Sequence, residues 1–93
     1  MKIIKFFIDN CFHCNRIEEE FWKLADKYKG RGITFGNRHV AFSSGVDDKY
    51  KLTIYPTVIL FDNDGKEVRR IEGVIPPKML EEFVKGAVDE FGE

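Results

Sequence analysis

Several common classes of protein are poorly matched by this 93-residue sequence. It has only two cysteines, whereas a small secreted scaffold usually carries more, spread along the chain. It also has no basic stripe or arm, because its 15 basic and 16 acidic residues are well mixed, with a net charge of −1. We therefore expect no nucleic-acid partner, since proteins that bind nucleic acid usually present clustered positive charge.

Long apolar runs are also missing. The N-terminal stretch MKIIKFFID is interrupted by Lys5 and is shorter than the apolar region of a secretory signal. No run approaches the roughly 20 residues that cross a bilayer. With 43% hydrophobic residues, the chain can form one modest core. We therefore expect a single cytoplasmic domain over residues 1–93, monomeric and with no membrane partner.

The apolar pattern predicts an alternation of strands and helices. We expect strands at 2–8, 33–42, 57–61 and 66–72, and helices at 11–29, 46–52 and 76–91. Asp9 and Asn10 are candidate N-caps of the first helix. The turn at 63–65, Asn-Asp-Gly, predicts an antiparallel hairpin, and the strand–helix–strand start predicts a parallel pair. The expected fold class is α/β, in the order β-α-β-α-β-β-α, with helices flanking both faces of a mixed four-stranded sheet.

The motif Cys11-Phe12-His13-Cys14 lies at the first strand-to-helix junction. Unpaired N–H groups and the helix dipole stabilise a thiolate at Cys11, which would attack a disulfide, while Cys14, one turn later, would resolve the product. His13, as an imidazolium, would favour the thiolate, although an exposed histidine without effect is the alternative. Phe12 is either an apolar contact for substrate or packs locally on the helix.

A Cys-x-x-Cys pair also occurs in zinc sites, which need four ligands. Only His13 and His39 could complete such a set, and His13 is badly placed because it adjoins Cys14. A structural disulfide is the other alternative, but so small a loop adds little stability. We therefore expect a redox-active dithiol and no metal.

These residues resemble the thioredoxin superfamily over nearly the whole chain. The resemblance rests on KFFIDNCFHC, TIYPTVILFDNDGKEV, Gly73 and the amphipathic final helix. It implies a minimal thioredoxin fold that lacks the N-terminal strand and helix of full thioredoxin. It also implies a cis Pro56 beside the dithiol, where the backbone of Tyr55 can pair with an extended substrate; an ordinary trans proline is the alternative.

Two positions depart from the patterns of this superfamily. Glutaredoxins hold glutathione with a Gly-rich, Asp-containing segment before the last helix, but residues 73–76 here read Gly-Val-Ile-Pro. We therefore expect no glutathione dependence and no cofactor, and we count Gly73 as a substrate contact. Thioredoxins also place a buried acid six residues before the first cysteine, where this chain has Lys5.

The role of Lys5 has two readings. If Lys5 is buried, its pKa falls and it could act as a neutral amine; we expect instead that its ammonium reaches solvent. With either reading, His13, Glu18 and water are the candidates to take the proton from Cys14.

The resemblance implies a thiol–disulfide oxidoreductase that acts on protein disulfides and is recharged by a reductase or another dithiol. Three alternatives stay open. One is a dedicated electron donor to a single enzyme such as ribonucleotide reductase. Another is a disulfide oxidase or isomerase, which His13 suggests. The last is a non-catalytic binding module that has kept the fold.

Overall fold

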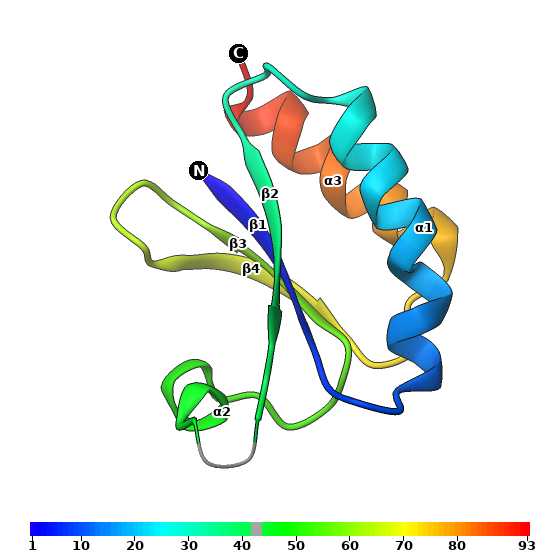
Figure 1. Cartoon of the computed structure of the whole chain (residues 1–93). Coiled ribbons are helices and arrows are strands. Elements are labelled where there is room, and N and C mark those ends of the chain that lie inside the picture. The colour runs from blue at the N-terminus through cyan, green and yellow to red at the C-terminus, as the bar shows by residue number, and fades with distance from the viewer. Residues whose placement is uncertain (42–43) are drawn as a thin grey trace.

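The computed structural model describes residues 1–41 and 44–93 (Figure 1). Positions 42 and 43, which the sequence assigns to the end of the second strand and the following loop, lie outside the described residues. The elements are β1 (Lys2–Phe7), α1 (Phe12–Lys27), β2 (Thr34–His39), α2 (Val46–Tyr50), β3 (Thr57–Phe61), β4 (Glu67–Glu72) and α3 (Pro77–Phe91). Their types and order confirm the predicted fold class, and their ends differ from the prediction by a few residues.

The four strands form one mixed sheet in the order β2-β1-β3-β4. β1 runs parallel to β2, in register from Lys2 opposite Thr34 to Phe7 opposite His39. β3 is antiparallel to both β1 and β4. The turn between β3 and β4 is closed by the Asp62 carboxylate, which accepts the N–H groups of Asp64 and Lys66, both at 2.9 Å.

Helices cover both faces of the sheet, as the sequence predicts. α1 and α3 lie together on one face, and the short α2 lies on the other (Figure 1). Successive strand residues point to opposite faces, so β3, buried along its whole length, contributes to two cores. Val58 and Leu60 pack in the core with α1 and α3, whereas Ile59 and Phe61 pack in the smaller core with α2.

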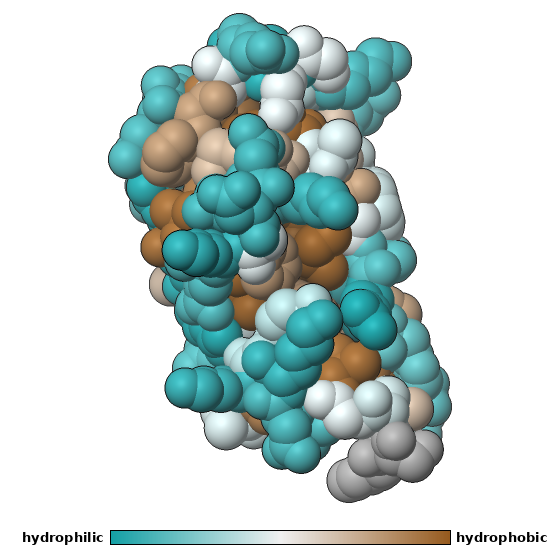
Figure 2. All heavy atoms as spheres, turned by 90° about the vertical axis from the view of Figure 1, so that its left-hand side faces the viewer, coloured by the Kyte–Doolittle hydropathy of each residue, from teal (hydrophilic) through white to brown (hydrophobic). Residues whose placement is uncertain are grey.

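The face that carries α2 is the less covered one. Figure 2 views the molecule from this side and shows apolar surface in patches between polar side chains. Next to α2 the surface forms a hollow of about 680 Å³, whose walls include Ile4, Phe6, Tyr50 and Phe61. The sheet is therefore packed fully by α1 and α3 and only in part by α2.

Candidate active site

The sheet register brings three segments to one edge. Phe6 of β1 lies opposite Thr57 of β3, and Thr57 lies opposite Glu72 of β4. The end of β1, the start of β3 and the end of β4 therefore meet. The residues just beyond these ends are the dithiol segment, Pro56 and Gly73. Strand pairing alone thus gathers the segments that the sequence singled out.

The two cysteines form a disulfide across the first turn of α1, with their Cα atoms 5.2 Å apart. Cys11, in extended conformation at φ −104°, is the N-cap, and its Sγ accepts the N–H of Cys14 at 3.2 Å. Cys14 is only 3% exposed, whereas Cys11 is partly exposed. Cys11 is therefore the more accessible cysteine of the two, and Cys14 is covered by protein.

The expectation that Asp9 or Asn10 caps α1 is wrong. Asn10 instead adopts a left-handed conformation at φ +54°, which turns the chain from β1 into the helix. Asparagine tolerates this conformation better than most residues. The next residue, Cys11, caps the helix instead, because its sulfur can accept a free N–H of the first turn.

The dipeptide between the cysteines lies at the surface. Phe12 is 67% exposed, and its ring is 5.3 Å from the His13 ring and 5.7 Å from the Arg16 guanidinium. Its contacts are therefore local ones on α1. His13 is partly exposed, next to the buried Cys14.

The loop before β3 carries the proline. The Tyr55–Pro56 peptide bond is cis, and Pro56 is buried. The Pro56 carbonyl accepts the N–H of Gly73 at 2.9 Å. Gly73 has φ +83°, and a Cβ there would lie 3.2 Å from the Cδ1 of Ile54. Glycine therefore allows both this backbone conformation and the close approach of the two segments.

Two further residues of the site were not found from the sequence. Ile54 is 46% exposed and Val74 is 65% exposed, although both are large apolar residues. They flank Tyr55–Pro56 and Gly73, and with Phe12 they place an apolar side chain on each of the three segments that meet here. We call Phe12, Ile54 and Val74 the apolar rim. The sequence signal that could have found Ile54 and Val74 was their position next to Tyr55 and Gly73, which the resemblance had already singled out.

The expectation that the Lys5 ammonium reaches solvent is wrong. Lys5 is fully buried, because β1 lies inside the sheet and α1 covers it. Its Nζ forms an ion pair with the Glu18 carboxylate and lies 5.3 Å from the ring of Phe21. Burial lowers the pKa of Lys5 to about 8. A charged pair is thus built into the interface between β1 and α1.

Glu18 lies one helical turn from the dithiol. It lies four residues after Cys14 on α1, and residues at that spacing are neighbours on a helix surface. Its second carboxylate oxygen accepts the indole N–H of Trp22 at 2.7 Å. Glu18 is therefore held by one ion pair and one hydrogen bond, a helical turn from the buried Cys14.

A hollow of about 520 Å³ adjoins the site. Its walls include Asn10, which precedes Cys11, and Tyr55, which precedes Pro56, together with Leu52 and Asp47. Burial, reinforced by the negative charge of Asp47, raises the pKa of the Tyr55 phenol. The hollow therefore offers mainly apolar walls next to the dithiol.

His39, which the sequence raised as a metal ligand, lies at the end of β2, where its Nε2 is 3.0 Å from Asp9. Within residues 1–41 and 44–93, no three His, Cys, Asp or Glu side chains gather as a metal site. Across the same residues, no helix is long and apolar enough to cross a membrane.

Comparisons with known proteins agree with this fold. A family described as a thioredoxin-like domain matches residues 2–87. The oxidised thioredoxin from Plasmodium falciparum superposes with a TM-score of 0.80 at 24% identity, over 94% of this chain and 80% of that one. A chain from a structure on thiol resolution in yeast mitochondrial 1-Cys peroxiredoxin superposes at 0.76, with 25% identity, over 91% of this chain and 76% of that one.

The similar curated proteins are protein disulfide-isomerases. Protein disulfide-isomerase like 2-2 of Arabidopsis thaliana is 26% identical over 81 residues, which is 87% of this chain and 18% of that protein. Protein disulfide-isomerase A4 of Homo sapiens is 30% identical over 73 residues, which is 76% of this chain and 11% of that protein. The chain thus spans less than a quarter of the length of these relatives.

Proposed function

Because the chain belongs to the thioredoxin-like domain family, we propose that it exchanges its Cys11–Cys14 dithiol with disulfides of other proteins. The family, the protein disulfide-isomerase relatives and the Cys11–Cys14 bridge support a thiol–disulfide oxidoreductase in general. The observation that carries the finer proposal is the unequal exposure of the two sulfurs. Cys11 is accessible at the helix N-terminus, and Cys14 is covered.

The proposed reaction has two displacement steps. The Cys11 thiolate attacks one sulfur of the substrate disulfide, forms a mixed disulfide and expels the first substrate thiolate. The Cys14 thiolate then attacks the Cys11 sulfur and expels the second. Two electrons pass from the dithiol to the substrate, and the chain is left with the Cys11–Cys14 bridge. A reductase or another dithiol would restore the reduced form.

The substrate would dock as an extended peptide. In this proposal the apolar rim contacts its side chains, and the backbone of Tyr55 pairs with its backbone beside Cys11. The support is that Phe12, Ile54 and Val74 are exposed apolar residues on segments that meet at one sheet edge. An apolar segment of a partly unfolded protein fits this surface.

The proton from Cys14 would pass to the pair formed by Lys5 and Glu18. Glu18 lies one helical turn from Cys14, and Lys5 has a pKa of about 8, close to that of an ordinary thiol. Matched pKa values favour proton transfer in either direction. In this proposal the buried pair takes the place of the buried acid that this chain lacks.

Insulin reduction in the presence of dithiothreitol tests the proposed function. We expect turnover by the wild type and loss of turnover in Cys11→Ser. In a separate reaction without dithiothreitol, we expect pre-reduced Cys14→Ser to accumulate a mixed disulfide with insulin, because the resolving thiol is gone. Wild-type turnover no greater than that of Cys11→Ser would overturn the proposal.

A disulfide oxidase or isomerase is the second candidate. His13 beside the dithiol and the protein disulfide-isomerase relatives favour it. A cation there would stabilise the reduced, thiolate form and make the disulfide more oxidising. We expect His13→Ala to lower the reduction potential by about 30 mV, the equivalent of about 1.4 kcal/mol. A wild-type potential at the reducing end of the thioredoxin range would count against this candidate.

A further inference from the structure

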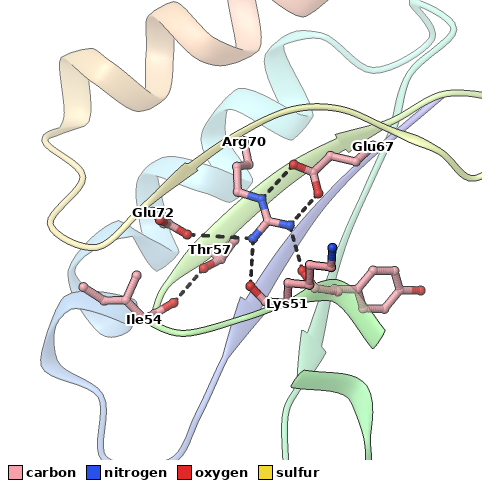
Figure 3. Close-up of polar contacts among 7 residues, drawn as sticks. Lys51, Ile54, Thr57, Glu67, Arg70 and Glu72 are labelled. Carbon is pink, nitrogen blue, oxygen red and sulfur yellow. Dashed lines mark hydrogen bonds and ion pairs between the residues drawn. The ribbon is translucent and has the colours of Figure 1, made fainter. Parts of the chain in front are cut away.

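Arg70, on β4, forms hydrogen bonds to the end of α2 and to the residue that follows it. The guanidinium of Arg70 donates to the carbonyl oxygens of Tyr50, at 2.7 Å, and Lys51, at 3.4 Å (Figure 3). It also pairs with the carboxylate of Glu67 through Nε, at 2.7 Å, and Nη2, and its Nη1 lies 3.8 Å from the carboxylate of Glu72. Arg70 therefore links an edge strand to the end of a helix on the face that carries α2.

The chain it holds leads directly to the candidate active site. We call residues 51–56 the substrate loop, because they contain Ile54, Tyr55 and Pro56. The loop is anchored at its start by Arg70 and at its end by the bond from the Gly73 N–H to the Pro56 carbonyl. Between these points the Thr57 hydroxyl donates to the Ile54 carbonyl at 2.6 Å. The Leu52 N–H adds a bond to the Asp47 carbonyl of α2, at 2.8 Å. Two of these anchors thus come from β4 and the residue after it.

The start of the loop needs such a partner. α2 has only five residues, and Lys51 leaves it in a left-handed conformation at φ +55°. The last carbonyls of a helix lack partners within the helix. The guanidinium makes its four hydrogen bonds here from three nitrogens in a planar fork, an arrangement that the three donors on the single nitrogen of a lysine cannot reproduce. The arrangement around Arg70 therefore depends on the shape of its side chain as well as on its charge.

We propose that Arg70 is a positioning residue, which fixes the substrate loop through the carbonyls of Tyr50 and Lys51 so that Tyr55 is presented beside Cys11. This inference rests on the proposed function. The hydrogen bonds and ion pairs of Arg70 go to Tyr50, Lys51, Glu67 and Glu72, which belong neither to the dithiol nor to the apolar rim. Its effect would therefore fall on docking of extended protein substrates and not on the reactivity of the sulfurs.

The chain offers a matched control on the same strand. Arg69 is the neighbouring arginine and also pairs with a carboxylate, but that carboxylate belongs to Glu90 of α3, on the opposite face of the sheet. Arg70→Lys and Arg69→Lys each keep the charge and lose the guanidinium. A difference between the two variants therefore reports on the substrate loop and not on the loss of an arginine from β4.

The test combines turnover with hydrogen exchange. For Arg70→Lys we expect KM for insulin to rise about fivefold with kcat within about twofold, because a loosened loop weakens docking. The reaction of the reduced protein with the small disulfide 5,5′-dithiobis(2-nitrobenzoic acid) should not change. Amides of the substrate loop should exchange about tenfold faster than in Arg69→Lys.

Each outcome decides the proposal. A rise in KM equal to that of Arg69→Lys, or unchanged exchange in the loop, would overturn it. If the wild type does not turn over insulin, the proposed function fails, and exchange in the loop alone then decides whether Arg70 holds it. If Arg70→Lys does not fold, Glu67→Gln replaces it, which keeps the arginine but weakens its support. In Glu67→Gln, KM for insulin and the amide exchange rates of the substrate loop should each rise about twofold. If neither rises, the proposal is overturned.

Discussion

Lys5 shows most clearly how a single residue can escape prediction from sequence. Its place six residues before Cys11 was evident, but the direction of its side chain was not. The side chain would have reached water from an edge strand, whereas β1 is an inner strand covered by α1. The order of strands in the sheet is a property of long-range pairing. The local sequence around Lys5 therefore could not decide between burial and exposure.

The buried ammonium of Lys5 should make stability depend on pH. Burial lowers its pKa from 10.5 to about 8, so the folded protein binds fewer protons than the unfolded chain between these values. The contribution of Lys5 to stability therefore rises with pH from about 8 to about 10.5. We expect Lys5→Met to be more stable than the wild type by about 3 kcal/mol at pH 7, with the gain shrinking across that window.

Urea unfolding of both proteins at pH 7 and pH 10 measures this difference. Lys2→Met is the matched control, because Lys2 lies on the same strand with its side chain exposed. The difference in free energy of unfolding between Lys2→Met and the wild type should stay constant over the same pH range. A flat difference for Lys5→Met as well would contradict the account of the buried ammonium.

The types of the seven elements could be predicted because local patterns specify them. The helical spacing of apolar residues on α1 and α3, the apolar run of β3 and the Asn-Asp-Gly turn each pointed to the structure found. The substrate loop is different, because its conformation depends on Arg70 and Gly73, which come later in the chain. No pattern within residues 51–56 reveals these partners.

Glycine substitutions in two elements should change stability in opposite directions. Gly86 lies inside α3, and a Cβ there would meet only ordinary contact, with Arg69 Nη1 at 3.7 Å. We expect Gly86→Ala to raise the free energy of unfolding by about 1 kcal/mol. Gly65, in the β3–β4 turn, has φ +82° with open space around it. Gly65→Ala should therefore lower the free energy of unfolding by about 1 kcal/mol through backbone strain alone.

Chemical denaturation of the two alanine variants tests this pair of predictions. Neither glycine lies near the dithiol, so insulin turnover should match that of the wild type in both. Two shifts in the same direction would show that the packing of α3 or the conformation of the turn has been misjudged.

The site as a whole arises from strand register. Cys11, Pro56 and Gly73 are far apart in sequence, yet pairing of β1 with β3 and of β3 with β4 places the segments that carry them at one edge of the sheet. The sequence indicated the residues through their motifs. Their association with Ile54 and Val74, and the ion pair between Glu18 and Lys5, emerged only from the folded chain.

The asymmetry of the two sulfurs is the central claim, and alkylation tests it directly. The reduced protein is treated with less than one equivalent of iodoacetamide between pH 6 and 8, and the labelled cysteine is identified by mass spectrometry. The urea-unfolded chain, in which both thiols are open, serves as the control. The account predicts label on Cys11 with Cys14 protected at every pH; label shared equally in the folded protein, or found first on Cys14, would contradict it.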